Sequence, residues 1–443
     1  MTESNHAVCR AGAAKCLITP PIGVSLAGYF HDRVATSIRD DPYARALVVE
    51  NADRRLALVS CDLATMTAEV SGAAKAIIAR ECAIPPERVL ICATHTHTGP
   101  ELRDNGVVPC LGAYVEELPN RIAGAVRAAC DATIEATLHP GRTEVHGYAF
   151  NRLHRLKDGA EVFGLGPATA ASVVGPAGPI DPELQTLTVR DLDGRVRAMA
   201  IHYALHPDVI GGAAADFISA DWPGAMARTV EGVYGDGAEC LFLQGTAGDI
   251  NHVPYTETYM PRKGPRKAEQ IGRALAGAAI YAAEKAEPMR DVTVDGAVEI
   301  LSIPYYTRDA AMFAEIERLR AIPRLGAQDK YILDRFEKWP HDGKNADVPV
   351  QALRIGEMAL TGFPAEVFVR IGLEVKQYSP ARHTWPVELA NARVSTYVPA
   401  TDQAGRGAYG AKPILSRWLC ADAGRRLSDA ALSALHRMWA EPR

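Results

Sequence analysis

The sequence lacks features that mark several other classes of protein. It has no Lys/Arg-rich run with interleaved aromatic residues, and the formal net charge of its 443 residues is only −5, so it offers no footprint for nucleic acid. No uninterrupted apolar stretch reaches the ~18 residues that a membrane-spanning helix needs. Residues 1–9 contain neither a basic nor an apolar segment, so we expect no secretory signal. These absences predict a soluble, cytoplasmic protein that acts on a small molecule.

Paired cysteines are also absent. Nine cysteines are scattered singly along the chain, without any C-x-x-C pair. An odd number of isolated cysteines does not suggest a disulfide framework. We expect them to be small buried side chains in a reducing compartment.

No repeat and no Ser/Gly linker divides the chain, so we expect a single catalytic domain over residues 1–443. Its first third alternates between strand and helix patterns. Apolar runs at 45–50 and 56–61 predict a hairpin, and an Ala-rich helix over 70–83 leads to a buried strand over 89–93. This order favours an α/β fold over an all-β sandwich.

Further along the chain, the pattern predicts helices over 114–138, 265–286 and 310–321, and strands over 144–150, 197–203, 239–244, 292–304, 350–355 and 358–363. Residues 156–182 are rich in Gly, Pro and Ala, which predicts a long loop that acts as a lid or binding loop. Residues 330–348 predict a polar surface segment. We therefore expect a mixed-sheet α/β fold with a strand-rich C-terminal third.

Histidines follow two of the predicted strands. In Thr94-His-Thr-His-Thr-Gly-Pro100, an extended backbone would project His95 and His97 to the same side. His206 follows the strand over 197–203. Ligands bind beyond the carboxyl ends of strands in open α/β sheets, and neutral imidazole is the commonest metal-ligand side chain. Taken alone, the histidine pair is equally compatible with two polar residues at the mouth of a loop.

A carboxylate could complete a metal site. A hydrolytic zinc site needs three or four N/O ligands, an open position for water, and outer groups that orient the ligands. Glu366 follows Pro364, where a strand breaks and a helix could start. Taken alone, Glu366 is more typical of a first-turn acid favoured by the helix dipole. Spacing alone does not join it to the histidines.

Five short motifs, in order along the chain, resemble the neutral/alkaline non-lysosomal ceramidase family. Thr94–Pro100 is similar to its T-H-T-H-S-G-P, Leu205–Pro207 to its V-H-P, and Ser219–Asp221 to its S-S-D. Gly248–Asn251 is similar to its G-D-V-S, and Pro364–Glu366 to its P-G-E. With fainter similarities elsewhere, the resemblance covers most of the chain, from about residue 10 to residue 409.

The resemblance implies a Zn2+-dependent hydrolase and its metal ligands. The family holds zinc through the first histidine of T-H-T-H, the histidine of V-H-P, the glutamate of P-G-E and a tyrosine. These positions fall on His95, His206, Glu366 and Tyr397. The tyrosine match rests on Ser395-Thr-Tyr-Val and on a second family tyrosine twelve positions later, which is Tyr409 here.

The resemblance also implies catalytic roles. His97 falls on the second histidine of the motif, and we expect it to pass a proton to the leaving nitrogen. Arg152 falls on an arginine that contacts the reacting group, so Arg152 or Tyr409 would help to stabilise the oxyanion. Without the resemblance, Tyr397 would be read as a strand aromatic and Arg152 as part of a surface ion pair.

The sequence departs from the family at several points. Asn251 stands where the family has a serine, which disfavours a serine acyl-enzyme route. We expect neither the signal peptide nor the immunoglobulin-like domain of secreted ceramidases. Residues 101–106 replace the family's glycine-rich continuation and place charge close to the substrate mouth. The sequence shows no apolar entrance for a sphingolipid, so we expect a polar substrate.

The leading prediction is therefore a zinc-dependent hydrolase that uses a metal-activated water to cleave an amide (N-acyl) bond of a small intracellular substrate. The same site could instead cleave a lactone or an ester, because zinc hydroxide attacks any activated carbonyl. A barrel-type amidohydrolase also has His-x-His after an apolar strand, but the strand-rich C-terminal third argues against it. A binding homologue without catalysis would contain no zinc. A homo-oligomer remains compatible with the sequence.

Overall fold

The computed structural model describes residues 6–104, 106–164, 169–212, 215–235, 237–254, 256 and 263–440. Its largest element is an eight-stranded sheet with the order β14-β12-β11-β6-β1-β3-β4-β5. The β4–β5 and β12–β14 pairs are parallel, and the other pairs are antiparallel. The strands are β1 (Cys9–Leu17), β3 (Tyr43–Asn51), β4 (Arg54–Cys61), β5 (Val89–Ala93), β6 (Ile134–Glu144), β11 (Glu183–Asp191), β12 (Val196–Tyr203) and β14 (Glu239–Gln244).

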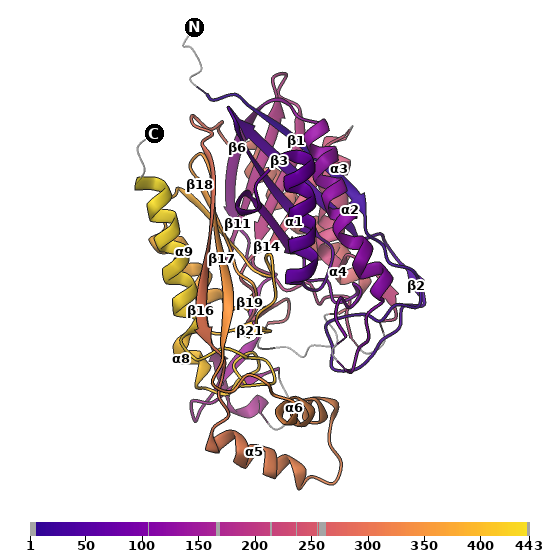
Figure 1. Ribbon diagram of the computed structural model, residues 1–443, viewed down its shortest axis with the longest axis vertical. Coiled ribbons are helices and arrows are strands. Elements are labelled where there is room, and N and C mark those ends of the chain that lie inside the picture. Colours follow the sequence, from indigo (N-terminus) through magenta and orange to yellow (C-terminus); the bar gives the residue numbers. More distant parts are fainter. Residues whose placement is uncertain are drawn as a thin grey trace.

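Four helices cover the outer face of this sheet (Figure 1). Side chains alternate across each strand, so Ala46 and Val48 pack against the helices, while Leu47 faces the opposite core. The first two helices cover β3, β4 and β5, and the other two cover β12 and β14. The helices are α1 (Ala68–Cys82), α2 (Gly112–Asp131), α3 (Asp221–Tyr234) and α4 (Pro265–Glu284).

A second, four-stranded sheet packs against the inner face. Its order is β16-β17-β18-β20. Leu353 and Trp385 of this sheet share one buried core with Leu47 and Leu241 of the large sheet. The strands are β16 (Val294–Pro304), β17 (Asn345–Ile355), β18 (Met358–Gly362) and β20 (His383–Val387).

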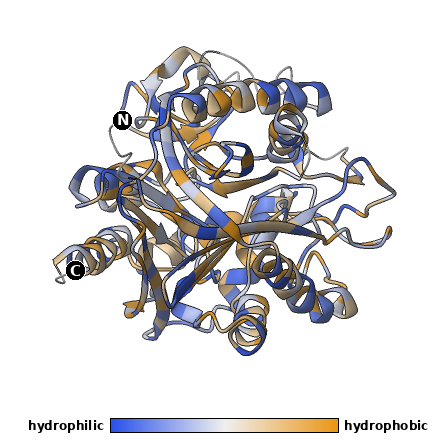
Figure 2. Ribbon diagram, turned by 90° about the horizontal axis from the view of Figure 1, so that it is seen from above, coloured by the Kyte–Doolittle hydropathy of each residue, from blue (hydrophilic) through white to orange (hydrophobic). Residues whose placement is uncertain are grey.

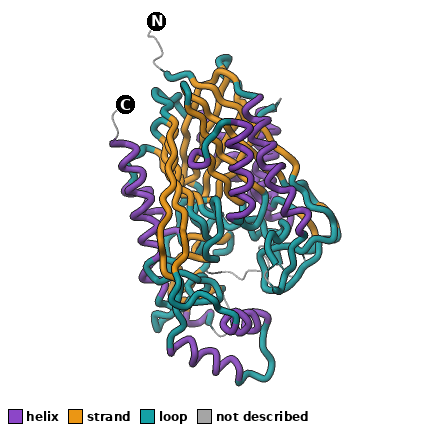
Figure 3. Tube along the Cα trace, viewed as in Figure 1, coloured by secondary structure: helices purple, strands orange, loops and turns teal. Residues whose placement is uncertain are grey.

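Helices α7 (Val369–Tyr378) and α9 (Ala423–Ala440) cover the far face of the second sheet. The result is a stack of helices, sheet, sheet and helices (Figure 3). Figure 2 shows hydrophilic and hydrophobic residues side by side on the helices, as expected when each helix buries one face and exposes the other. None of the described helices is long and apolar enough to cross a membrane.

The large sheet curls, and shorter elements complete the molecule. The edge strand β14 lies close to β3, β4 and β5, and Ser60 Oγ donates a hydrogen bond to Phe242 O across this approach. Helices α5 and α6 project at one end of the molecule (Figure 1). The short elements are β2 (Ser37–Ile38), η1 (Pro86–Arg88), β7 (Phe150–Asn151), β8 (Leu153–Leu156), β9 (Glu161–Phe163), η2 (Ala170–Ser172), β10 (Val173–Pro176), β13 (Phe217–Ile218), β15 (Ile250–Asn251), α5 (Ala310–Arg320), α6 (Ala327–Glu337), β19 (Glu366–Val367), β21 (Tyr397–Val398) and α8 (Thr401–Ala404).

The structure confirms the mixed α/β fold and corrects three local predictions. The helix expected over 114–138 ends at Asp131, and β6 follows it, because β-branched Thr133 and Ile134 replace the Ala-rich pattern. The strand expected over 144–150 is wrong, since residues 145–149 connect β6 to the two-residue β7.

The segment over 156–182 is not one long loop. Within its described part, β8, β9 and β10 form a three-stranded sheet, while residues 165–168 lie outside the described residues. The polar segment over 330–348 contains most of α6 and the start of β17. The Gly-, Pro- and Ala-rich composition of 156–182 suggests a loop, but tertiary contacts impose regular structure on it.

Candidate metal centre

Two strand ends bring the histidines together. His95 lies just beyond β5, where its backbone N–H donates to Leu63 O and the N–H of Thr94 donates to Cys61 O. His95 has a φ of 76°, a conformation that few residues other than glycine adopt and that turns the chain away from the sheet. His206 lies three residues beyond the end of β12. Because the large sheet curls, these ends of two strands that are not neighbours meet at one point.

The three imidazoles converge through their Nε2 atoms. His95 Nε2 lies 3.1 Å from His206 Nε2 and 3.2 Å from His97 Nε2, and the His206–His97 distance is also 3.2 Å. Glu366 Oε2 lies 3.2 Å from His95 Nε2 and 4.0 Å from His206 Nε2. All four side chains are buried. The four groups therefore surround one small volume.

The protonation states of these side chains favour the binding of a cation. His95 Nδ1 donates to the carbonyl of Ala64, so in the neutral ring Nε2 carries a lone pair. Burial lowers the pKa of His97 to about 3 and that of His206 well below its usual value, so both rings are neutral at pH 7. Burial alone would raise the pKa of Glu366, but its interactions with His95 and Arg152 lower it to about 2. Neutral imidazole nitrogens and one carboxylate are a donor set that suits a divalent metal ion.

A strand pair places the fourth expected ligand. β19 and β21 pair in parallel, and Glu366 and Tyr397 are register partners. Tyr397 is buried, and burial together with the Glu366 charge raises the pKa of its phenol well above 10. The interpretation of Glu366 as a first-turn helical acid is wrong, because α7 begins only at Val369.

Arg152 and Tyr409 lie beside this group. Arg152 is buried and donates from Nη2 to Gly248 O at 2.5 Å, which does not fit the interpretation as a surface ion pair. Its guanidinium lies 5.4 Å from the ring centre of Tyr397 and 5.5 Å from that of Tyr409. The structure thus brings together all seven residues named from the sequence, and their individual roles stay predictions.

More than half of the chain matches a known protein family. Residues 10–250 match the family described as neutral/alkaline non-lysosomal ceramidase, N-terminal. The chain belongs to this family. The family resemblance inferred from the five motifs is therefore confirmed.

Two solved ceramidase structures share the fold. Neutral ceramidase from Pseudomonas aeruginosa is 20% identical, with a TM-score of 0.74 over 97% of this chain and 75% of that chain. A ceramidase complexed with C2 is also 20% identical, with a TM-score of 0.75 and the same coverage. No curated protein matches the chain at a significant level.

Two buried acidic residues that were given no role from the sequence support the segments around this site. Asp221, in the S-A-D motif, accepts hydrogen bonds from the N–H groups of Val209 and Ile210, and so holds the loop after His206. Buried Glu388 accepts a 2.6 Å hydrogen bond from the N–H of Val367, next to Glu366. The S-A-D motif gave a sequence signal for Asp221, whereas nothing around Glu388 did.

Asn251 does not take part in the site. It lies in β15, pairs with Phe150 of β7, and accepts a hydrogen bond from the N–H of Val253 through Oδ1. It lines none of the cavities at the histidines. The expectation that no serine acyl-enzyme forms here stays a prediction.

Two cavities meet at the histidines. An outer cavity of about 740 Å3 has apolar walls that include Phe163, Ile210 and Phe217, which the sequence did not reveal because they come from distant segments. An inner cavity of about 80 Å3 is more polar. Both cavities are lined by His97 and Tyr397. A substrate held at the histidines would therefore extend into two different environments.

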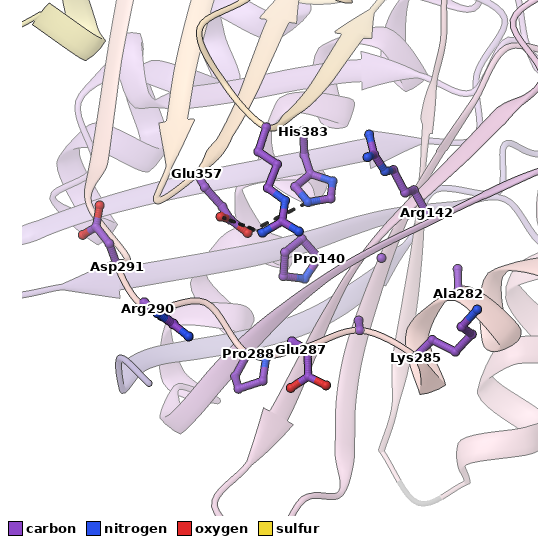
Figure 4. A pocket seen from close by; sticks show the side chains of 13 residues that line it. Pro140, Arg142, Ala282, Lys285, Glu287, Pro288, Arg290, Asp291, Glu357 and His383 are labelled. Carbon is purple, nitrogen blue, oxygen red and sulfur yellow. Dashed lines mark ion pairs between the residues drawn. The ribbon is translucent and has the colours of Figure 1, made fainter. Parts of the chain in front are cut away.

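A third cavity, of about 600 Å3, shares no described lining residue with these two (Figure 4). Two of its charged side chains, Glu357 and Arg382, lie 3.7 Å apart, and Glu357 lies 3.9 Å from the ring of His383. Burial and the neighbouring cations Arg142 and Arg382 lower the pKa of His383 to about 4. This cavity has no cluster of metal-binding side chains among the described residues and is not a candidate catalytic site.

Proposed function

We propose that this ceramidase-family protein is a zinc-dependent hydrolase that cleaves an amide (N-acyl) bond of a small substrate by means of a metal-activated water. The observation that supports this most directly is the convergence of three buried imidazoles and one carboxylate on a single point. His95, His206, Glu366 and Tyr397 would hold the ion. When bound there, zinc would polarise the scissile carbonyl and lower the pKa of water to about 7.

The other residues have roles that their positions support. His97 lies within 3.2 Å of both expected histidine ligands and lines both cavities, so its neutral ring can accept a proton there and pass it to the leaving nitrogen as the C–N bond breaks. Arg152 and Tyr409 line the outer cavity beside Tyr397, where their donors can stabilise negative charge on the carbonyl oxygen. Burial of the whole group strengthens each of these interactions.

Metal analysis combined with an N-acyl hydrolysis assay tests this proposal. We expect about one zinc per chain in the purified protein, loss of hydrolysis on chelation, and its return when zinc is added. His95→Ala should lose both zinc and turnover. His139→Ala is the matched control, because His139 lies on β6 and hydrogen-bonds Thr137 and Ala286 O away from the cluster. Turnover that survives complete chelation would contradict the proposal.

A further inference from the structure

Three arginines line the inner cavity next to the candidate metal ligands. Arg103 follows the histidine motif, Arg335 lies on α6, and Arg393 lies shortly before β21. They come from three distant parts of the sequence, and all three side chains are at least partly buried. Their convergence on a cavity of about 80 Å3 concentrates positive charge beside the reaction centre.

The acids that line the cavity offset this positive charge only in part, since the charge of Glu101 raises the pKa of Arg103 while Arg393 and Arg335 lower it. The described residues that line it include two carboxylates, Glu366 at the metal centre and Glu101. Glu101 Oε1 accepts hydrogen bonds from the backbone N–H groups of Leu102 and Arg103. One carboxylate outside the metal centre therefore faces three arginines.

The positive charges of the three arginines also repel one another. The charge on Arg393, followed by burial and the charge on Arg335, lowers the pKa of Arg103 to about 10. The Nε atoms of Arg103 and Arg393 are buried and have no hydrogen-bond partner among the described residues. Buried donors without acceptors are costly, and like charges held together add to that cost. An anionic group bound in the cavity would relieve both.

The outer cavity is mainly apolar, in contrast to the charged inner cavity. Phe163, Ile210 and Phe217 form apolar walls there, and its volume of about 740 Å3 is suited to an alkyl or aryl group. Because both cavities are lined by His97 and Tyr397, an amide bond at the histidines would point one substituent into each of them.

We propose that the substrate is an N-acyl amino acid, with the carboxylate of the amino acid bound by Arg103, Arg335 and Arg393 and the acyl group in the outer cavity. This inference rests on the amide hydrolysis proposed above. The planar guanidinium fork matches a carboxylate in a bidentate manner. The oxygen of water bonds to the acyl carbon, the C–N bond breaks, and a proton from water passes to the nitrogen, which yields a free carboxylic acid and an amino acid.

Paired substrates test the proposal. N-acylglycine and N-acylglycinamide with the same acyl chain differ only in the charge that the arginines would bind. We expect kcat/KM to be at least tenfold higher for the acid, since the arginines can make hydrogen bonds to a charged carboxylate that are stronger than those to a neutral amide. Arg393→Gln and Arg103→Gln should each reduce this preference about tenfold or more, chiefly by raising KM for the acid.

Arg382→Gln is the matched control, because Arg382 is exposed and lies in the third cavity. It should leave both the rates and the preference unchanged. An equal or higher kcat/KM for the amide would overturn the proposal, as would a preference for the acid that survives both arginine substitutions.

Calorimetric binding of the same two compounds separates this inference from the proposed function. The acid could bind more tightly than the amide in the wild type but not in Arg393→Gln, with neither compound hydrolysed. That result would support the anion site and contradict the proposed amide hydrolysis. If both compounds bind with equal affinity, the anion site fails, whatever amides the enzyme cleaves.

Discussion

Single residues at the metal centre depend on backbone conformations that most residues avoid. His95 and Asp221 have φ values of 76° and 54°, although neither is glycine. Such conformations persist only where the surrounding structure imposes them, and they are frequent at functional sites. Gly28 adopts a φ of 97° against the ring of His97, and a Cβ atom built there would lie 2.5 Å from His97 Nδ1.

Gly28→Ala should therefore displace His97. We expect kcat to fall at least tenfold, because a small shift of a proton donor is enough to disrupt proton transfer. Gly23→Ala is a close control, since Gly23 has a φ of 94° but no atom within 4 Å of its Cβ position. Both variants should lose about 1 kcal/mol of stability through backbone strain, measured by urea unfolding. Equal kcat values for the two variants would show that the contact with His97 does not matter.

Among single residues, the sequence allowed the clustered side chains to be predicted better than the walls of the cavities around them. The motifs pointed to His95, His206, Glu366 and Tyr397, and the structure places them together. Charge near the substrate mouth was also expected from residues 101–106. Arg335 on α6 and Arg393 before β21 were not expected there. Each lies far along the chain from the histidines, and only tertiary packing brings them to the cavity.

Two-residue strands carry two of the four expected ligands, Glu366 and Tyr397. β19 and β21 have two residues each, too few to show a strand pattern in the sequence, and their pairing joins segments about thirty residues apart. The longer strands and the helices over 70–83 and 265–286 could be predicted, because hydrophobic periodicity extends over many residues there. The helix boundary near Asp131 was missed, because alanines continue to Ala136 and conceal the change to β-branched residues at Thr133 and Ile134.

Asp249 connects these short elements. Its Oδ1 accepts a hydrogen bond from the N–H of Val369, at the start of α7, and its Oδ2 accepts one from Asn151 Nδ2. It therefore ties the segment that carries Arg152 to the segment that follows Glu366. Through Asp249, the G-D-I-N motif connects two segments of the site.

Asp249→Ala should leave buried donors unsatisfied and loosen both segments. We expect a loss of about 1–3 kcal/mol in the free energy of unfolding, together with a fall in kcat/KM and weaker zinc retention. Asp309→Ala serves as the comparison, because Asp309 Oδ1 accepts from the N–H of Met312 at the start of α5, outside the metal centre. That variant should lose about 1 kcal/mol with catalysis intact. Catalysis in Asp249→Ala that matches wild type would refute the connecting role.

The whole molecule depends on the contact between its two sheets. The class of fold could be predicted from the order of strands and helices, but not the layering, because the curl of the large sheet results from twist accumulated over eight strands. His202 of β12 lies in this contact with an exposed fraction of 1%. Its ring stacks on Trp385, with centroids 5.6 Å apart, and Nε2 donates to Pro386 O at 3.0 Å.

Burial of His202 makes stability depend on pH. Burial lowers the pKa of His202 from 6.5 to about 3, and its Nδ1 atom has no hydrogen-bond partner among the described residues. The unfolded chain therefore takes up a proton that the folded chain excludes. This group stabilises the fold fully above about pH 6.5, and that contribution is lost as the pH falls from 6.5 towards 3, by up to ~1.4 kcal/mol per pH unit.

His202→Phe should flatten this dependence while keeping the ring against Trp385. Urea unfolding of wild type and variant at pH 7.5, 6 and 5 measures how the free energy of unfolding changes with pH. Below pH 6.5 this slope should be smaller in the variant by up to ~1.4 kcal/mol per pH unit, the contribution of one proton. His436→Gln provides the comparison, because His436 is exposed on α9 and its loss should leave the slope as in wild type. A slope in His202→Phe equal to that of wild type would mean that His202 accepts its proton in the folded state, and that the sheet contact tolerates a buried charge.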